Sequence, residues 1–193
     1  MLKTPITAII LAGGKSSRMQ YNDKGLLLLK CKPLFKHVID KIKPQVNEII
    51  INCNQNETQY SLAGYPIIKD ELPGFLGPLA GIYSGLVASN TQWNLIVSCD
   101  TPFLPADLVS KLFTIIGHAN AGYVVEKEKS HPTVLLINKN QIVNIKDALE
   151  KGERKLLIYL KKINAKPIKF YNQKDSFVNI NTPEDLAYWE AKL

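Results

Sequence analysis

Residues 6–24, ITAIILAGGKSSRMQYNDK, constrain the fold of this chain more than any other segment. The apolar run Ile6–Leu11 predicts a buried strand that stops at Gly13-Gly14, and three cations follow it: Lys15, Arg18 and Lys24. In an open α/β sheet, ligands bind outside the carboxyl ends of the strands, and glycines let backbone N–H groups approach a phosphate closely. The segment predicts a polyphosphate site, although an ordinary Gly-Gly turn with solvated lysines fits the glycines equally well.

Two familiar phosphate loops do not match this segment. A Walker loop needs a glycine five positions before Gly14-Lys15-Ser16, and Ile9 stands there. A dinucleotide fingerprint needs G-x-G-x-x-G, whereas this segment has two adjacent glycines and no third. Arg18 favours a specific role for the loop, because the chain is rich in lysine and contains only one other arginine, Arg154.

Strand and helix patterns alternate along the first half of the chain. The predicted strands are Ile6–Leu11, Glu48–Asn52, Pro66–Lys69 and Asn94–Ser98. The predicted helices begin at Pro33, with Leu34, Val38 and Ile42 at four-residue spacing before Pro44, at Leu79, and at Pro105. This order indicates βαβ units and a mostly parallel α/β sheet. No linker or repeat interrupts it, so residues 1–193 are expected to form a single domain.

The second half is less regular. The predicted strands are Ala121–Glu126 and Thr133–Ile137, on either side of a polar segment at residues 127–131, and then Ile168–Tyr171 and Phe177–Asn179. The predicted helices are Gln141–Lys151 and Glu153–Ile163. A last helix is expected after Thr182, which would cap it with Pro183 at its first position. These features have a purely structural explanation.

Asp100 is the strongest candidate for a metal ligand. It follows a buried strand and precedes Thr101-Pro102, which ends that strand. If this strand is a neighbour of Ile6–Leu11, the carboxylate lies beside the glycine loop. One carboxylate, phosphate oxygens and waters form a common Mg²⁺ site, which can offset charge during displacement at phosphorus. An aspartate serving only as a turn residue is the alternative.

Further polar groups are expected at the same edge of the sheet. Asn52 ends the second predicted strand and Asp70 follows the third, while the glycine-rich turn Gly74–Gly81 leads into a helix. The backbone of this turn could contact a base or a ribose. Strand-end capping or tight packing would explain each feature taken singly, but four such strand ends on one edge favour a ligand site.

Composition excludes several classes of protein. No apolar run approaches the roughly 18 residues that span a bilayer, so no membrane association is expected. The formal charge of +7 comes from scattered lysines, without the basic and aromatic runs typical of nucleic-acid binding, and an anionic small substrate fits it equally well. The three cysteines, Cys31, Cys53 and Cys99, form no metal-binding or redox spacing and suggest a reducing compartment, hence the cytoplasm.

Covalent catalysis is not favoured, because no Ser/His/Asp arrangement or Cys/His pair is suggested by spacing. Of the three histidines, His37 and His118 fit ordinary helix positions. His131 precedes Pro132-Thr133 at a predicted strand and could meet an anionic second substrate, or serve only the turn before that strand.

The series LAGGKSSRM, DKGLL, KPL, GPLAG, CDTP, HPT, GERK and NINTPEDLA runs through nearly the whole chain. This order resembles the nucleotidyltransferases that build activated sugars, lipids and cofactors. Within them it is similar to the molybdenum cofactor guanylyltransferases, which join GMP to molybdopterin. The first motif is shared by a large superfamily, whereas Ala12-Gly13-Gly14, GPLAG and CDTP point to the guanylyl branch.

The resemblance implies a three-layer, nucleotide-diphospho-sugar transferase-like fold with a Rossmann-like nucleotide-binding N-terminal half. It implies GTP and molybdopterin as substrates, Mg²⁺ as cofactor, and transient contacts with other cofactor-biosynthesis proteins and apo-molybdoenzymes. A cytidylyltransferase and a nucleotide-binding adaptor without catalysis stay open as alternatives.

The resemblance also implies roles for particular residues. The GTP-binding set is Leu11, Ala12, Gly13, Lys24, Asn52, Asp70 and Asp100. Together with the residue patterns above, the resemblance gives a catalytic set of Arg18, Lys24 and Asp100, with Asp100 also the metal ligand. The candidates for the second substrate or a second metal are His131, Asn179 and Asn181. One departure from the family pattern is Gln20, which stands where a glycine usually follows Arg-Met and affects the positioning of Lys24.

Overall fold

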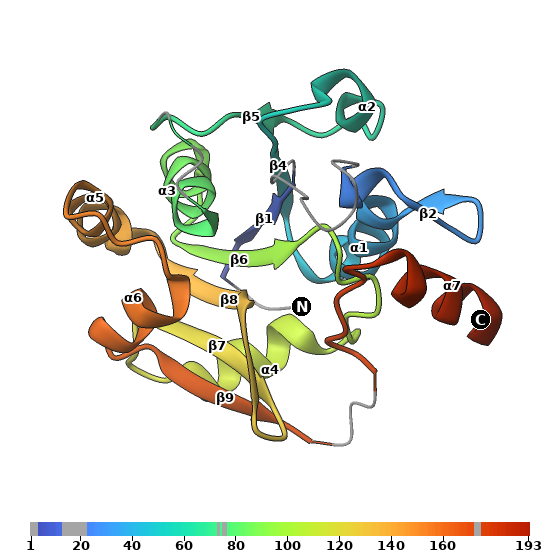
Figure 1. Ribbon diagram of the computed structural model, residues 1–193. Coiled ribbons are helices and arrows are strands. Elements are labelled where there is room, and N and C mark those ends of the chain that lie inside the picture. Colours follow the sequence, from blue (N-terminus) through green and yellow to red (C-terminus); the bar gives the residue numbers. More distant parts are fainter. Residues whose placement is uncertain (1–3, 13–22, 73, 75–76, 172–174) are drawn as a thin grey trace.

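The fold is built on one seven-stranded sheet, seen in a computed structural model that describes residues 4–12, 23–72, 74, 77–171 and 175–193 (Figure 1). Its strand order is β5-β4-β1-β6-β8-β7-β9, and β8 alone runs antiparallel to its neighbours. The strands are β1 (Ile6–Leu11), β4 (Glu48–Asn52), β5 (Ile67–Ile68), β6 (Trp93–Ser98), β7 (Ala121–Glu126), β8 (Lys129–Asn138) and β9 (Lys166–Phe170). A separate hairpin pairs β2 (Leu28–Leu29) with β3 (Lys32–Pro33).

Helices cover both faces of the sheet and give three layers. The α-helices are α1 (Leu34–Ile42), α2 (Glu57–Ser61), α3 (Pro78–Ala88), α4 (Leu108–Ile116), α5 (Ile142–Glu150), α6 (Leu156–Lys162) and α7 (Pro183–Lys192). Short 3-10 turns lie at Lys24–Leu26, Lys43–Gln45 and Lys139–Gln141. One core joins α1 and α4 to the sheet, and a second core on the other face joins α3, α5 and α6. In Figure 1, α7 lies beside the β2–β3 hairpin.

Side-chain alternation explains how one strand serves two cores. Successive side chains of a strand point to opposite faces. Ala8 and Ile10 of β1 therefore belong to the core beneath α1, whereas Ile9 belongs to the core beneath α3, and all three are fully buried. Burial on both faces is typical of parallel sheets covered by crossover helices. The predicted mostly parallel α/β, three-layer fold is confirmed.

Most element boundaries agree with the sequence predictions. β1, β4 and β7 have the predicted bounds, β5 is shorter, and Thr182 caps α7 through a full capping box with Asp185. The predicted helix at Pro105 instead begins at Leu108. The Gln45 side chain explains this start, because it donates to the carbonyl of Pro105 and accepts from the N–H of Val109.

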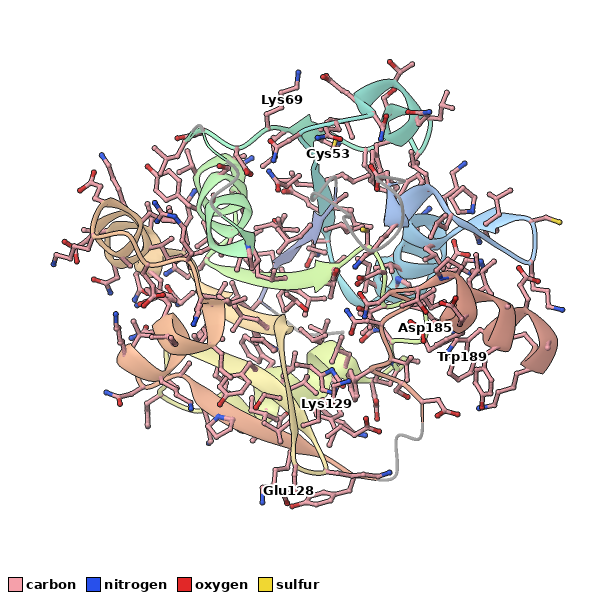
Figure 2. All side chains as sticks on the ribbon, viewed as in Figure 1. Cys53, Lys69, Glu128, Lys129, Asp185 and Trp189 are labelled. Carbon is pink, nitrogen blue, oxygen red and sulfur yellow. The ribbon has the colours of Figure 1, made fainter. Side chains whose placement is uncertain are left out.

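Two predictions for the second half were wrong. The polar segment at residues 127–131 is largely strand: Glu126 pairs with Lys129, which leaves a two-residue turn, and His131 already lies within β8. Polar residues pair there because a hairpin end needs no apolar face. Figure 2 shows Glu128 at this turn, pointing away from the sheet. The predicted strand at Phe177–Asn179 is irregular. Phe177 is buried against Phe170, and the side chain of Asn179 donates a hydrogen bond to Asp100.

The topology gathers the ends of five strands at one edge. The strands β5, β4, β1 and β6 are parallel neighbours, so their carboxyl ends lie side by side. β8 runs the other way, so its beginning lies at that same edge. The expectation that the strand before Asp100 neighbours the first strand is confirmed by the pairing of Leu11 with Ser98. In the described part of the chain, no helix has the length and apolar character required to cross a membrane.

Candidate active site

Asp100 lies at the carboxyl end of β6, buried and held on one side by hydrogen bonds. Its Oδ1 atom accepts from Ser98 Oγ at 2.6 Å and from Asn179 Nδ2 at 2.9 Å. Its Oδ2 atom lies 3.7 Å from Lys24 Nζ. Hydrogen bonds to one oxygen of a carboxylate fix the direction of the other. Asp100 is thus an oriented carboxylate beside a lysine.

The Lys24 ammonium lies between the carboxylate and the C-terminal segment. Its Nζ atom donates to Asn181 Oδ1 at 2.7 Å, and the side chain stays partly exposed. Asn179 and Asn181 both face the site because alternate residues of an extended segment point the same way. Ile180 between them points into a small core with Leu29, and its N–H donates to the backbone carbonyl of Asp100.

The capping box of α7 holds this extended segment in place. The Asp185 carboxylate accepts from the backbone N–H groups of Asn181 and Thr182, and its own N–H donates to the Thr182 hydroxyl. Figure 2 shows Asp185 and Trp189 on this helix. A local helix-start signal therefore fixes the two asparagines against Asp100 and Lys24.

A second polar cluster forms where β4 and β5 end. The Asn52 side chain donates to Asp70 Oδ1 at 3.0 Å, and Asn54 donates to Asp70 Oδ2 at 2.8 Å and accepts from the Asp70 N–H at 2.9 Å. Asn52 is buried, and Asp70 is partly exposed. Strand pairing of β4 with β5 thus brings Asn52 and Asp70 together, while the nucleoside-binding role expected of them stays a prediction.

Helix α3 begins at this second cluster. Gly77 has a φ of 76°, which a glycine adopts without strain, and Pro78 takes the first helical position. A Cβ atom at Gly81 would lie 2.4 Å from Asn52 Oδ1, so only glycine lets the helix approach this amide so closely. In GPLAG, Gly77 therefore serves the turn before α3, and Gly81 serves packing against Asn52.

Two backbone groups of the expected nucleotide loop are used within the sheet. The N–H of Ala12 donates to the carbonyl of Asn52 at 2.8 Å, and the carbonyl of Leu11 accepts from Cys99 at 3.0 Å. A nucleotide contact at Leu11 or Ala12 would use other backbone atoms. Gly13, Arg18 and Gln20 lie outside the described residues, as do Lys15 and the rest of residues 13–22.

His131 is buried at the start of β8 and has few polar neighbours. Its ring packs on Phe177, its Nε2 atom lies 3.9 Å from Glu126 Oε2, and this atom has no hydrogen-bond partner among the described residues. Burial, and next the charge of Lys129, lowers the pKa of His131 from 6.5 to about 4. The imidazole is therefore neutral at pH 7, which weakens any role in attracting an anion by charge.

The buried thiols are not activated. Burial raises the pKa of Cys99 well above its ordinary value, with Asp100 as the next cause. Burial also raises the pKa of Cys53 to about 11, with Glu57 as the next cause. Nucleophilic cysteines need a lowered pKa, so Cys53 and Cys99 are not suited to act as nucleophiles.

Asp100 is the carboxylate that the described residues place beside Lys24. Across the described ranges, no three His, Cys, Asp or Glu side chains are gathered so that they could hold an ion. Asp100 keeps its Oδ2 atom directed toward Lys24 while Oδ1 accepts its hydrogen bonds. Mg²⁺ commonly uses one or two carboxylates and completes its octahedron with phosphates and waters. The donor set therefore fits a magnesium ion that arrives with a nucleotide.

Several residues of the site were not foreseen from the sequence. Ser98 could have been found, because it lies two residues before Asp100 at a strand end. Asn54 and Tyr60 gave no signal, since their roles depend on where the loops after β4 fold. Tyr60 comes from α2 and donates to Asp23 Oδ1 at 2.6 Å.

A mostly parallel α/β sheet with an oriented carboxylate, a lysine and an Asn–Asp pair on its carboxyl edge fits the nucleotidyltransferase class. The model of the MobA-like NTP transferase domain matches residues 8–163. This chain belongs to that family.

Curated relatives match over nearly the full length. The molybdenum cofactor guanylyltransferases of Yersinia pestis (strain Pestoides F) and Yersinia pseudotuberculosis serotype O:1b are each 47% identical over 187 residues, covering 97% of this chain and 96% of theirs. The predicted family resemblance is confirmed.

Solved structures share the fold. Molybdopterin-guanine dinucleotide biosynthesis protein A from Archaeoglobus fulgidus has a TM-score of 0.79 at 23% identity, covering 96% of this chain and 97% of that one. The 4-diphosphocytidyl-2C-methyl-D-erythritol synthase from Anaerococcus prevotii has a TM-score of 0.77 at 15% identity, covering 98% and 96%. Since a guanine-linked and a cytidyl-linked protein both match, the fold alone does not select the base.

Proposed function

We propose that this protein transfers GMP from GTP to the terminal phosphate of molybdopterin, with release of pyrophosphate. The observation that carries the proposal is the order of the expected GTP-binding residues along the carboxyl edge of the sheet. Asp70 follows β5, Asn52 ends β4, Leu11 ends β1, and Asp100 follows β6, and these four strands are consecutive neighbours. The relatives named molybdenum cofactor guanylyltransferase, 47% identical, support the choice of substrates.

A nucleotide laid across this edge meets its groups in a chemically sensible order. The Asn52–Asp70 pair offers hydrogen-bonding groups to the nucleoside at one side. Lys24 and Asp100 lie at the other side, where a triphosphate would end. β1 lies between β4 and β6 in the sheet, and we assign the sequence after it, beginning at Gly13, to the phosphates, as its glycines suggest.

The residues around the triphosphate have separate tasks in the proposed reaction. Asp100 would hold Mg²⁺, which supplies positive charge to the phosphate oxygens when it is bound. Lys24 and Arg18 would stabilise the charge that develops on pyrophosphate as the molybdopterin phosphate attacks the α-phosphorus in line. We place the second substrate on the side of Asn179, Asn181 and His131, beyond β6, because β8 follows β6 in the sheet.

The proposal extends to the setting of the reaction. We propose a cytoplasmic enzyme that hands its product to apo-molybdoenzymes through transient contacts with other cofactor-biosynthesis proteins. The sparse, unpaired cysteines are compatible with a reducing compartment.

The fate of isotopic label tests the proposed transfer. With molybdopterin and Mg²⁺, phosphorus label in the α position of GTP should enter the pterin product, and label in the γ position should leave as pyrophosphate. Tight GTP binding with both labels retained in GTP would instead support the non-catalytic adaptor. Omitting molybdopterin is the control, and it should leave both labels in GTP.

A further inference from the structure

The carboxylate of Asp23 is held from three directions directly before Lys24. Its Oδ1 atom accepts from the N–H of Gly25 at 3.1 Å and from the Tyr60 hydroxyl at 2.6 Å. Its Oδ2 atom accepts from Asn56 Nδ2 at 3.1 Å. The first bond caps the 3-10 turn that carries Lys24, while the other two tie that turn to α2, more than thirty residues later in the chain.

Tyr60 is a rigid donor in this arrangement. Its side chain is fully buried, and its ring packs edge-on against Phe35 of α1 with centroids 4.7 Å apart. Burial, and after it Cys99 and Asp23, raises the pKa of Tyr60 far above its ordinary range, so the hydroxyl keeps its proton. A short hydrogen bond from a buried hydroxyl to a carboxylate is among the stronger ones in proteins.

The chain after Lys24 is shaped to fit this hydroxyl. A Cβ atom at Gly25 would lie 2.3 Å from the Tyr60 hydroxyl and 3.1 Å from Cys99 Sγ. The turn at Gly25 therefore packs closely against Tyr60 and against Cys99, the residue before Asp100. Movement of the Tyr60 hydroxyl would therefore move the backbone that carries Lys24. Within the described residues, the Lys24 ammonium has only Asn181 and Asp100 as polar neighbours.

We propose that Tyr60 is a positioning residue that acts through Asp23 to hold the Lys24 ammonium where it meets the phosphates of the nucleotide. Asn56 supports the same carboxylate from the other side. This inference rests on the proposed contact of Lys24 with the phosphates. It gives α2, a short helix in the crossover from β4 to β5, an indirect part in phosphate binding. The separation of 37 positions between Tyr60 and Asp23 hides this part in the sequence.

The test compares GTP with guanosine, because Lys24 would contact only the phosphates. Calorimetry on the purified protein with Mg²⁺ gives both dissociation constants. The ratio of the guanosine Kd to the GTP Kd measures the phosphate contribution. Tyr60→Phe should lower that ratio by about ten-fold, since it removes one hydrogen bond to a charged group, with guanosine binding unchanged. A purely structural role would weaken both ligands together or neither.

A double variant shows whether the effect passes through Lys24. In the Lys24→Ala background, adding Tyr60→Phe should lower the ratio no further. Tyr159→Phe is the matched control, because its hydroxyl is also buried but has no partner within the described residues. It should keep the wild-type ratio.

Asn56→Gly provides a second variant if Tyr60→Phe folds poorly. Asn56 has a φ of 57°, which glycine adopts freely, so the change removes the amide without straining the backbone. It should lower the ratio in the same direction. An unchanged ratio in Tyr60→Phe and Asn56→Gly, with a loss in Lys24→Ala, would overturn this inference alone. An unchanged ratio in Lys24→Ala would overturn the proposed phosphate contact itself.

Discussion

The Nζ atom of Lys24 donates to Asn181 Oδ1 across 157 positions of sequence. This bond joins the 3-10 turn at Lys24–Leu26 to the segment before α7, and its acceptor, Asn181, lies outside the 8–163 range of the family match. The candidate site is therefore completed by Asn179 and Asn181 near the end of the chain, a region that packs against Leu29 of the β2–β3 hairpin through Ile180 and Trp189.

Lys24→Ala should lower GTP-dependent turnover by roughly 10²-fold or more, because one preorganised charge at the leaving group is removed. Steady-state pyrophosphate release with saturating molybdopterin measures the effect. Lys151→Ala is the matched control, since that lysine is exposed and pairs with Asp147 one helical turn away. Equal kinetics in the two variants would remove Lys24 from the site.

Asp100→Ala should abolish turnover and flatten the response to added Mg²⁺, because Asp100 is the carboxylate that we assign to the metal. The measurement is turnover against Mg²⁺ concentration, with circular dichroism as a check on folding. Asp147→Ala, which removes an exposed carboxylate, should retain the wild-type curve. Substantial activity in Asp100→Ala would refute the metal assignment.

Gly81→Ala should destabilise the protein and weaken nucleoside binding, because the new Cβ meets Asn52 Oδ1 at 2.4 Å and Leu11 Cδ2 at 3.0 Å. Overpacking of this kind costs about 1–3 kcal/mol of unfolding free energy. Urea unfolding measures the cost in the single variant and in the Asn52→Ala background. The cost should be smaller where the amide is gone, and an equal cost in both backgrounds would contradict the proposed packing.

The stability of the protein should fall between pH 6.5 and pH 4. The pKa of His131 is lowered to about 4, mainly by burial, whereas the ordinary value is 6.5. The unfolded chain therefore binds more protons in this window, and the free energy of unfolding decreases by at most about 1.4 kcal/mol per pH unit from this residue.

Urea unfolding at pH 7 and pH 5 tests this sign. His131→Gln should lose part of the pH dependence, while His118→Gln, which changes an exposed histidine, should retain it. A pH dependence that is identical in wild type and His131→Gln would show that His131 is not buried as a neutral group.

The sheet and its carboxyl edge could be predicted because they depend on local pattern. The apolar run Ile6–Leu11 and the capping signal at Thr182 are each encoded by a few adjacent residues, and both elements have the predicted form. The start of α4 could not be predicted in this way. It depends on Gln45, which lies about sixty residues earlier and whose side chain hydrogen-bonds to the backbone at Pro105 and Val109.

Some residues of the candidate site could likewise be predicted from local pattern, and others could not. Asn52 ends β4, and Asp100 and Asp70 lie two residues after β6 and β5, so the strand pattern of the sequence points to all three. Asn54, Tyr60 and the bond between Lys24 and Asn181 depend on how loops cross the edge of the sheet. Nothing in residue spacing encodes such contacts, because they arise only when the chain packs.

Nucleotide preference tests the central claim of guanylyl transfer most directly. GTP, CTP and UTP are each offered at equal concentration with molybdopterin and Mg²⁺, and pyrophosphate release gives kcat/KM for each. The account predicts that GTP is strongly preferred and that the product carries guanine. A preference for CTP would contradict it and would identify the protein as a cytidylyltransferase of the same fold.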